Sequence, residues 1–375
     1  MRLITAVAAS LLITACTSTS TGAVHQASPS PSAVETSPPS KFSPLPAIPL
    51  QETIEGMRMT SLSVMWVATD TRVLRSTDAG RTWSDVTPPD RPGRWSAFFA
   101  LDDSAAWVAS SLDRAPTFTV MRTVDGGRTW QGSTGPMSGI GPTVLDFVDR
   151  RDGWVLVDGG VAAGSQAVSI DRTTDGGATW KVVASTEDPN TGAPGTSGLQ
   201  FSCDKGAFAF GSTLIGLLPT ACATNQQSAY RTIDGGLHWA AVDLPPLSGV
   251  YQAFFAAPIF LTPSDVVISG SAELVSSHDG GASWTVHRLP GDGSVDFDTP
   301  TSGWQLNETS ISATSDGGSS WHVVASSLPF NGSGMALQYL GKGIAIAFWW
   351  HGTSAYRTAD GGRTWRSITP GGLSS

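Results

Sequence analysis

YRTADGGRTW occupies residues 356–365, and six relatives of this decapeptide precede it in the chain. Aligned on their aspartate, the seven decapeptide repeats carry Ser or Thr two residues before it, Gly two residues after it and Trp five residues after it. The aspartates are Asp78, Asp125, Asp175, Asp234, Asp279, Asp316 and Asp360. The tryptophans are Trp83, Trp130, Trp180, Trp239, Trp284, Trp321 and Trp365. Seven equivalent catalytic sites are implausible, so this pattern indicates a repeat architecture and a structural turn.

The composition of each repeat predicts a hairpin. Asp-Gly-Gly between two short β-like runs is typical of a tight connection between antiparallel strands. We expect the carboxylate to accept hydrogen bonds from backbone N–H groups one to three residues later, and the preceding hydroxyl to bond to the same turn. Gly at the second position after Asp can adopt a positive φ without steric cost. The Trp begins the returning strand, buries up to about 250 Å², and is predicted to fill a gap between sheets.

The pattern resembles the Asp-box (BNR) repeat, S/T-x-D-x-G-x-T-W, over roughly residues 52–370. Such repeats occur in sialidases, sortilin-type receptors, some glycoside hydrolases and the photosystem II assembly and stability factor family. The resemblance implies an all-β, seven-bladed β-propeller with four-stranded antiparallel blades. It also places one repeat at the turn between the third and fourth strands of each blade, away from the ligand site. The assembly factor family is the most similar, because Phe147…Gly153-Trp154 and Phe297…Gly303-Trp304 echo its Phe-x-Asp…Gly-Trp spacing.

Upstream of the repeats, paired apolar runs predict strands one and two of a blade. The clearest runs are residues 57–68, 144–157, 199–210, 295–306 and 337–348. An arginine precedes the repeat hydroxyl in five units: Arg75, Arg122, Arg172, Arg231 and Arg357. These arginines could form an anion-binding ring, but we favour stacking on a neighbouring Trp or pairing with a repeat Asp.

Charge and composition exclude one class of partner. The formal net charge is −9, and only 14% of the residues are charged. Nucleic-acid binding requires a positive surface, so no nucleic-acid partner is expected. We expect a monomer without a cofactor.

The N-terminus resembles a bacterial lipoprotein signal. Residues 1–15 contain one arginine, an apolar run and small residues immediately before Cys16. The apolar run is too short to span a membrane. The resemblance implies lipidation of Cys16 and anchoring to the outer face of the bacterial cell membrane; an ordinary signal peptide is the alternative. Residues 16–50 are rich in Ser, Thr, Pro and Ala and predict a flexible tether. Residues 51–375 are predicted to form the propeller.

Two further cysteines, Cys203 and Cys222, remain in the chain. In an exported protein they predict a disulfide, with a pair of free thiols as the alternative. We interpret residues 211–227, which contain Cys222, as an insertion between strands two and three of unit four; a disulfide-bridged loop there is a candidate for binding, and a loop that only covers a blade is the alternative.

Besides this insertion, two sets of residues are candidates for ligand or partner binding. Polar side chains on the predicted innermost strands could line the central channel: Arg58, Asp146, Gln200, Asp296 and Gln338. A solvated pore without a ligand is the alternative reading of this set. The second set lies in FWWHGT (348–353) and consists of Trp349, Trp350 and His351. Exposed Trp beside a turn is typical of sugar stacking or of a protein hot spot, although strand alternation predicts that one of the two is buried.

The residues favour a non-catalytic propeller that binds a protein or glycan outside the cytoplasm. An exo-glycosidase of sialidase type is the alternative, but its Arg-Ile-Pro motif is missing and Tyr251 is the sole free nucleophile candidate. For a two-carboxylate glycosidase, Asp146 and Asp296 are the best candidates by position. The histidines show no ligand spacing, so no metal site is predicted. A purely structural envelope protein is a third possibility.

Overall fold

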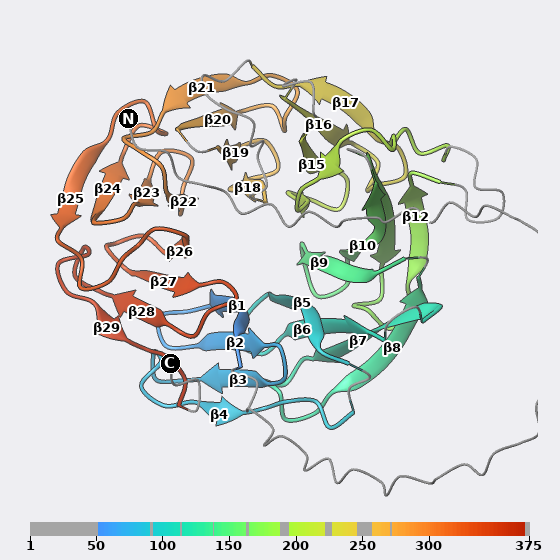
Figure 1. The fold of residues 1–375 in the computed structure, drawn as a ribbon, viewed down its shortest axis with the longest axis horizontal. Helices are drawn as coiled ribbons and strands as arrows, with labels where there is room; N and C mark the ends of the chain where they lie inside the picture. The colour runs from blue at the N-terminus through green and yellow to red at the C-terminus, as the bar shows by residue number, and fades with distance from the viewer. Residues whose placement is uncertain are drawn as a thin grey trace, which may run out of the picture. The chain divides into compact units, whose positions relative to one another are not determined.

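The regular structure of the described residues consists of strands, arranged as seven antiparallel sheets in a ring (Figure 1). The computed structural model describes residues 52–90, 93–112, 115–137, 139–162, 165–187, 195–221, 227–245, 257–270 and 272–371. The chain divides into two units after Pro49, and the ring belongs to the second unit, Leu50–Ser375. Within the described ranges, no helix has the length and apolarity that crossing a membrane requires. The predicted seven-bladed β-propeller is therefore confirmed.

Each blade is built from strands that are consecutive in the chain. Blades 1 to 3 contain β1 (Ile54–Met59), β2 (Met65–Thr69), β3 (Val73–Ser76) and β4 (Ser84–Asp85); β5 (Trp95–Ala100), β6 (Ala106–Ser111), β7 (Thr117–Thr123) and β8 (Gln131–Pro136); and β9 (Gly141–Phe147), β10 (Gly153–Ala162), β11 (Ser165–Thr173) and β12 (Lys181–Ser185). Blade 4 contains β13 (Asp204–Lys205), β14 (Ala209–Phe210), β15 (Gly216–Ala221), β16 (Gln227–Thr232) and β17 (Ala240–Asp243). Blades 5 to 7 contain β18 (Ile259–Phe260), β19 (Val266–Ser269), β20 (Glu273–Ser277) and β21 (Thr285–Arg288); β22 (Ser294–Phe297), β23 (Gly303–Leu306), β24 (Ser310–Thr314) and β25 (His322–Ser326); and β26 (Met335–Tyr339), β27 (Ala345–Trp349), β28 (Ala355–Thr358) and β29 (Arg366–Ser367).

The alternating strand direction gives the ring two distinct ends. In each blade the first strand lies nearest the centre and the fourth at the rim (Figure 1). Because the four strands are antiparallel, the turns between strands one and two and between strands three and four share one end. The decapeptide repeats form the latter turns, so we name this the repeat end. The connections between strands two and three, and from one blade to the next, share the opposite end, which we name the loop end.

The decapeptide repeats close their turns with a common set of hydrogen bonds, except that in blade 4 the His238 ring takes the place of the last hydroxyl. In blade 2, Thr123 Oγ1 donates to Asp125 Oδ1 (2.9 Å) and accepts from the Gly127 N–H (2.9 Å). The Thr129 N–H donates to Asp125 Oδ1 (3.0 Å), and the Thr129 hydroxyl donates to Oδ2 (2.6 Å). The carboxylate thus accepts from the residue four positions later, and in blades 1, 3 and 5 it also accepts from the N–H three positions later, as predicted, at 2.9–3.0 Å. The N–H groups one and two positions later bond elsewhere: in blade 2 that of Gly126 donates to the Ser104 carbonyl in the turn between strands one and two, and that of Gly127 donates to Thr123 Oγ1.

The repeat tryptophans pack between adjacent blades, as their size predicts. The structure contains seven hydrophobic clusters, and each includes one of them. Trp180, for example, packs with Phe118 of blade 2 and Phe147 of blade 3 at ring-centroid distances of 6.1 and 6.0 Å. The repeats therefore fasten a hairpin within a blade and fill the boundary with its neighbour.

The Gly-Trp pairs that begin second strands explain the inner packing. A Cβ on Gly153 would meet the Phe147 ring of the same blade at 2.3 Å, so only Gly leaves room for that ring. The following Trp154 stacks on Phe210 of blade 4, with centroids 3.6 Å apart and planes within 3°. Trp107 stacks on Phe147 in the same manner, at 3.8 Å. The Phe…Gly-Trp spacing thus encodes contact between successive blades.

Blade 4 departs from the predicted strand positions. Residues 199–210 were predicted to hold strands one and two, but β13 and β14 are two pieces of the first strand. The second strand, β15, lies within residues 211–227, which the sequence suggested were an insertion. Residues 200–203 lie outside any strand, and their carbonyls accept hydrogen bonds from the buried ammonium of Lys205 at 2.6–3.1 Å. The chain wraps around this cation before the first strand begins.

Candidate functional site

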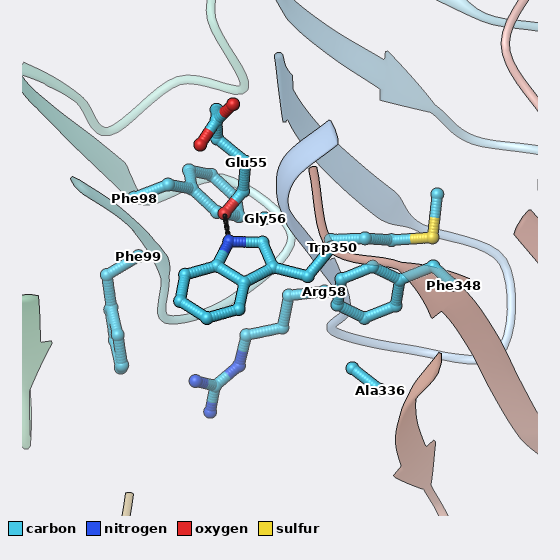
Figure 2. Close-up of a pocket in the computed structure, with 9 residues that line it drawn as sticks. Glu55, Gly56, Arg58, Phe98, Phe99, Ala336, Phe348 and Trp350 are labelled. Atoms are coloured by element: carbon cyan, nitrogen blue, oxygen red, sulfur yellow. Dashed lines mark hydrogen bonds between the residues drawn. The ribbon is translucent and has the colours of Figure 1, made fainter. Parts of the chain in front are cut away.

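A pocket of about 290 Å³ opens where blades 7, 1 and 2 meet (Figure 2). Blade 1 contributes Glu55–Arg58 to the walls of the pocket. Blade 2 contributes Phe98 and Phe99 from β5, and blade 7 contributes Ala336 from β26 and Phe348 and Trp350 at the end of β27. Because β1 begins and β27 ends at the loop end, the pocket opens on the side opposite the decapeptide repeats.

Trp350 is exposed but held in place at the pocket mouth. Its indole N–H donates to the Glu55 carbonyl at 3.1 Å (Figure 2). The next side chain, His351, stacks on the indole at 4.6 Å and places its Nδ1 3.0 Å from a Glu55 carboxylate oxygen. Backbone bonds continue this junction: the Ile54 N–H donates to the Gly352 carbonyl (2.7 Å), and the His351 N–H donates to the Ile54 carbonyl (2.8 Å). The FWWHGT segment therefore joins blade 7 to blade 1.

The expectation that one tryptophan of the pair is buried was wrong. Trp349 is 41% exposed and Trp350 is 60% exposed. Alternation applies only within a strand, and β27 ends at Trp349, after which His351 adopts a positive φ of 58°. Both indoles therefore remain accessible at the loop end.

Three predicted channel residues connect neighbouring blades. Asp146 Oδ2 accepts from the Phe210 N–H at 2.7 Å, and Asp296 Oδ2 accepts from the Tyr339 N–H at 2.7 Å. The Gln338 amide accepts from the Met59 N–H (2.7 Å) and donates to the Met59 carbonyl (3.0 Å), which links blade 7 to blade 1. Each residue thus fixes the first strand of the next blade.

The two channel carboxylates titrate near neutrality. Burial raises the pKa of Asp146 to about 6 and that of Asp296 to about 7, while hydrogen bonds from the backbone and the charge of Arg58 lower both. The two residues lie on β9 and β22, and each is already committed to a backbone N–H. This geometry gives both residues a role in the contact between blades.

Arg58 occupies the same strand position but makes different contacts. In the strand register of blade 1, Arg58 lies opposite Trp66 of the second strand. Asp146 lies opposite Trp154, and Asp296 opposite Trp304, in the same way. The guanidinium lies 4.5 Å from the centroid of the Phe99 ring, and Figure 2 shows it extending past Trp350. Among the described residues it forms no hydrogen bond and no ion pair. Burial lowers its pKa, and the charges of Asp146 and Asp296 raise it.

Gln200 does not belong to this set. It is exposed and precedes β13, so the prediction that it lies on an innermost strand was wrong. The displacement follows from the wrapping of residues 200–203 around Lys205, whose pKa burial lowers to about 8. Cys203 is disulfide-bonded, and its predicted partner Cys222 lies outside the described residues, as do Cys16 and Tyr251.

The repeat arginines serve neighbouring turns. Arg122 Nη1 donates to the Asp175 carbonyl of the next blade at 2.9 Å, and Arg231 Nε donates to the Gly280 carbonyl at 2.7 Å. Arg172 stacks on Trp154 at 5.2 Å. These contacts favour the structural interpretation over an anion-binding ring, although the acceptors are backbone carbonyls and not the repeat carboxylates.

Asp171 was not among the residues predicted from the sequence. It lies on β11, is 0% exposed, and both carboxylate oxygens lack a hydrogen-bond partner among the described residues. Burial raises its pKa to about 7. The corresponding positions of blades 1 and 2 hold Leu74 and Met121, so an aspartate among apolar equivalents was the available signal. In the described part of the chain, no three His, Cys, Asp or Glu side chains group as metal ligands would.

The fold and the site define a β-propeller with an aromatic pocket at one end of its ring. No protein-family model matches the sequence, and no curated protein matches it. Among solved structures, the chain is similar to YCF48 bound to D1 peptide: 14% identity, 86% of this chain, 93% of that chain, TM-score 0.52. It is similar to YCF48 from Cyanidioschyzon merolae, with 15% identity, 80% and 94% coverage, and a TM-score of 0.53.

A third similar structure is the extracellular domain of the putative one component system BT4673 from B. thetaiotaomicron. The identity is 10%, the TM-score is 0.52, and the match covers 82% of this chain and 38% of that chain. At such identities these likenesses show a shared propeller fold.

Proposed function

We propose that this chain is a non-catalytic, extracytoplasmic lipoprotein whose propeller binds a partner protein or glycan through its loop end. The observation that carries the proposal is Trp350, which is 60% exposed and yet fixed by its hydrogen bond to Glu55 above an aromatic pocket. A large aromatic side chain held in one orientation contributes contact area at little entropic cost, which is why Trp is enriched in binding hot spots.

The chemistry of the two ends supports this assignment. At the repeat end, the Asp and hydroxyl groups of the repeats are used by their own turns. Single aliphatic side chains are exposed at that end too, such as Ile233 (63%), but isolated exposure of this kind is ordinary. The exposed large aromatic side chains of the described residues, Trp349 and Trp350, both lie at the loop end.

A propeller of the same fold, YCF48, has been solved bound to D1 peptide. This precedent supports a protein partner before a glycan. The apolar run ahead of Cys16 supports the lipid anchor, and the polar segment 16–50 would hold the propeller away from the bilayer.

The test is site-specific photocrosslinking of the full chain in its own membrane. A photoreactive amino acid replaces Trp349 at the loop end, and the matched control replaces Ile233 at the repeat end. We expect a discrete crosslinked partner from position 349 alone, and its loss in a Trp350→Ala background. Crosslinks only from position 233, or from neither position, would refute the loop-end assignment.

The membrane anchor and the glycosidase alternative have separate readouts. Cys16→Ser should release the chain from the membrane fraction if Cys16 is lipidated. Hydrolysis of a fluorogenic sialoside by the purified chain would favour the enzyme over the binding protein.

A further inference from the structure

Arg58 is the exception among the polar side chains at its strand position. Asp146, Asp296 and Gln338 each accept a hydrogen bond from a backbone N–H of the next blade. A guanidinium has five N–H donors and no acceptor, so it cannot make that bond. Arg58 therefore does not act as a blade fastener, and its donors form no hydrogen bond within the described residues.

The surroundings of Arg58 combine one cation with apolar walls. Phe99 lies under the guanidinium at 4.5 Å, and Phe98, Phe348 and Trp350 complete the aromatic walls (Figure 2). Gly56 lets the Phe98 ring pack directly on the backbone of β1, since a Cβ there would meet Phe98 at 2.8 Å. An unpaired, partly buried cation in such surroundings is costly and gains most from an anion that brings its own hydrogen-bond acceptors.

We propose that the pocket binds a carboxylate carried by an aromatic or branched aliphatic group, with Arg58 holding the carboxylate through two parallel hydrogen bonds. The apolar group packs against Phe348 and Trp350. A volume of about 290 Å³ suits a ligand of the size of one capped amino acid. The same chemistry is presented by a free small carboxylate and by the terminal residue of a peptide. The inference deepens the proposed function, because it names the ligand chemistry of the same loop-end site.

Charged neighbours make this binding dependent on pH. The groups around Arg58 are Glu55 on its own strand, His351 at the mouth, and Asp146 and Asp296, whose charges reach it from other blades. Below pH 6 the last two are protonated, and Arg58 is free to pair with an incoming carboxylate. Above pH 7 both are ionised, attract the guanidinium and repel the ligand. Affinity should therefore fall as the pH rises from 5.5 to 8.

The experiment is a titration of the full-length chain followed by ligand-observed NMR. The probes are N-acetylphenylalanine, its neutral amide, and a six-residue peptide ending in phenylalanine with a free or amidated C-terminus. We expect the free acid to bind with a dissociation constant of about 1 mM, as for other ligands this small, and its amide at least about tenfold more weakly. Tighter binding of the peptide acid than of the capped amino acid identifies a peptide terminus as the source, and equal binding identifies a small carboxylate.

Matched variants separate charge from packing. Arg58→Gln should weaken the acid about 10- to 100-fold and leave the amide unchanged, whereas Trp350→Ala should weaken both. Arg363→Gln, at an exposed repeat position, is the control and should change neither. Thermal unfolding of each variant checks that the fold is intact. Equal binding of acid and amide, no binding of either, or insensitivity to Arg58→Gln would each overturn the proposal.

The outcome also distinguishes this inference from the proposed function. If Arg58→Gln leaves the photocrosslinked partner at position 349 unchanged and the free acid does not bind, the partner is recognised without a carboxylate in the pocket. The loop-end function then stands and the carboxylate site is refuted. If no partner is crosslinked but the free acid binds, the reverse holds.

Discussion

Asp171→Asn should stabilise the propeller at neutral pH and have little effect in acid. Asp171 is fully buried without a hydrogen-bond partner among the described residues, and its pKa rises from 3.8 to about 7. Between these two values the folded state keeps a proton that the unfolded state has released. The free energy of unfolding therefore falls as the pH rises through this interval and is constant again above about pH 7.

The magnitude follows from the shift. One pKa unit corresponds to about 1.4 kcal/mol, so the burial of Asp171 costs on the order of 4 kcal/mol once it is ionised. Asparagine has nearly the same shape and no charge, and its own buried amide adds a cost that does not depend on pH. The difference in unfolding free energy between variant and parent should therefore grow by about 1.4 kcal/mol per unit from pH 4 to 7.

Urea unfolding at one-unit intervals from pH 4 to 8, followed by tryptophan fluorescence, measures this difference. Asp146 and Asp296 titrate in both proteins, so their contributions cancel in the comparison. Asp171→Leu, which introduces the residue found at position 74 of blade 1, provides a second neutral variant with the same expected pH dependence. A difference that is independent of pH, or one that shrinks as the pH rises, would show that Asp171 is not buried as the structure places it.

Three further substitutions test the contacts between and within blades. Gln338→Ala removes two hydrogen bonds to Met59 and should lower the free energy of unfolding by about 2 kcal/mol in urea titrations; an unchanged midpoint would show that the ring closes without them. Asp125→Ala leaves the hydroxyls and N–H groups of one repeat without their acceptor and should lower the free energy of unfolding by about 1–3 kcal/mol. Hydrogen exchange should increase only in the blade 2 turn. A uniform increase over the chain would show that these bonds do not stabilise the turn locally. Gly153→Ala places a methyl group 2.3 Å from the Phe147 ring and should destabilise the chain by about 1–3 kcal/mol and change the near-ultraviolet circular dichroism, whereas a parent-like spectrum would contradict the packing.

The sequence predicts the architecture because its signals are local and repeated. The turn of Asp125 needs only residues 123–129 to close, and the Gly153-Trp154 pair carries the contact with both its own Phe147 and the next blade. The turn signal recurs once per blade, and its repetition separates it from chance.

The site could be predicted only in part, because it depends on residues that are distant in the chain. Trp350 and Arg58 were predicted in two separate sets of candidate residues, but their shared pocket requires blade 7 to lie beside blade 1. Gln200 was misplaced because one buried ammonium, that of Lys205, redirects the chain before blade 4, and no periodic pattern reports such a contact. Asp171 was missed because its position varies among the repeats, from Leu74 and Met121 to Ser312, so that an ionisable residue there is visible only when the blades are aligned.

Each sheet of the ring is formed by one continuous stretch of chain. No strand is shared between blades 7 and 1, and the contacts of Gln338, Trp350 and His351 hold their junction together. Cutting the polypeptide between any two other blades would therefore interrupt no sheet. A circular permutant that begins at blade 3 and joins Ile368 to Ile54 through a short linker should keep every strand pairing. The order of the blades around the axis would stay the same, and the chain termini would lie between blades 2 and 3.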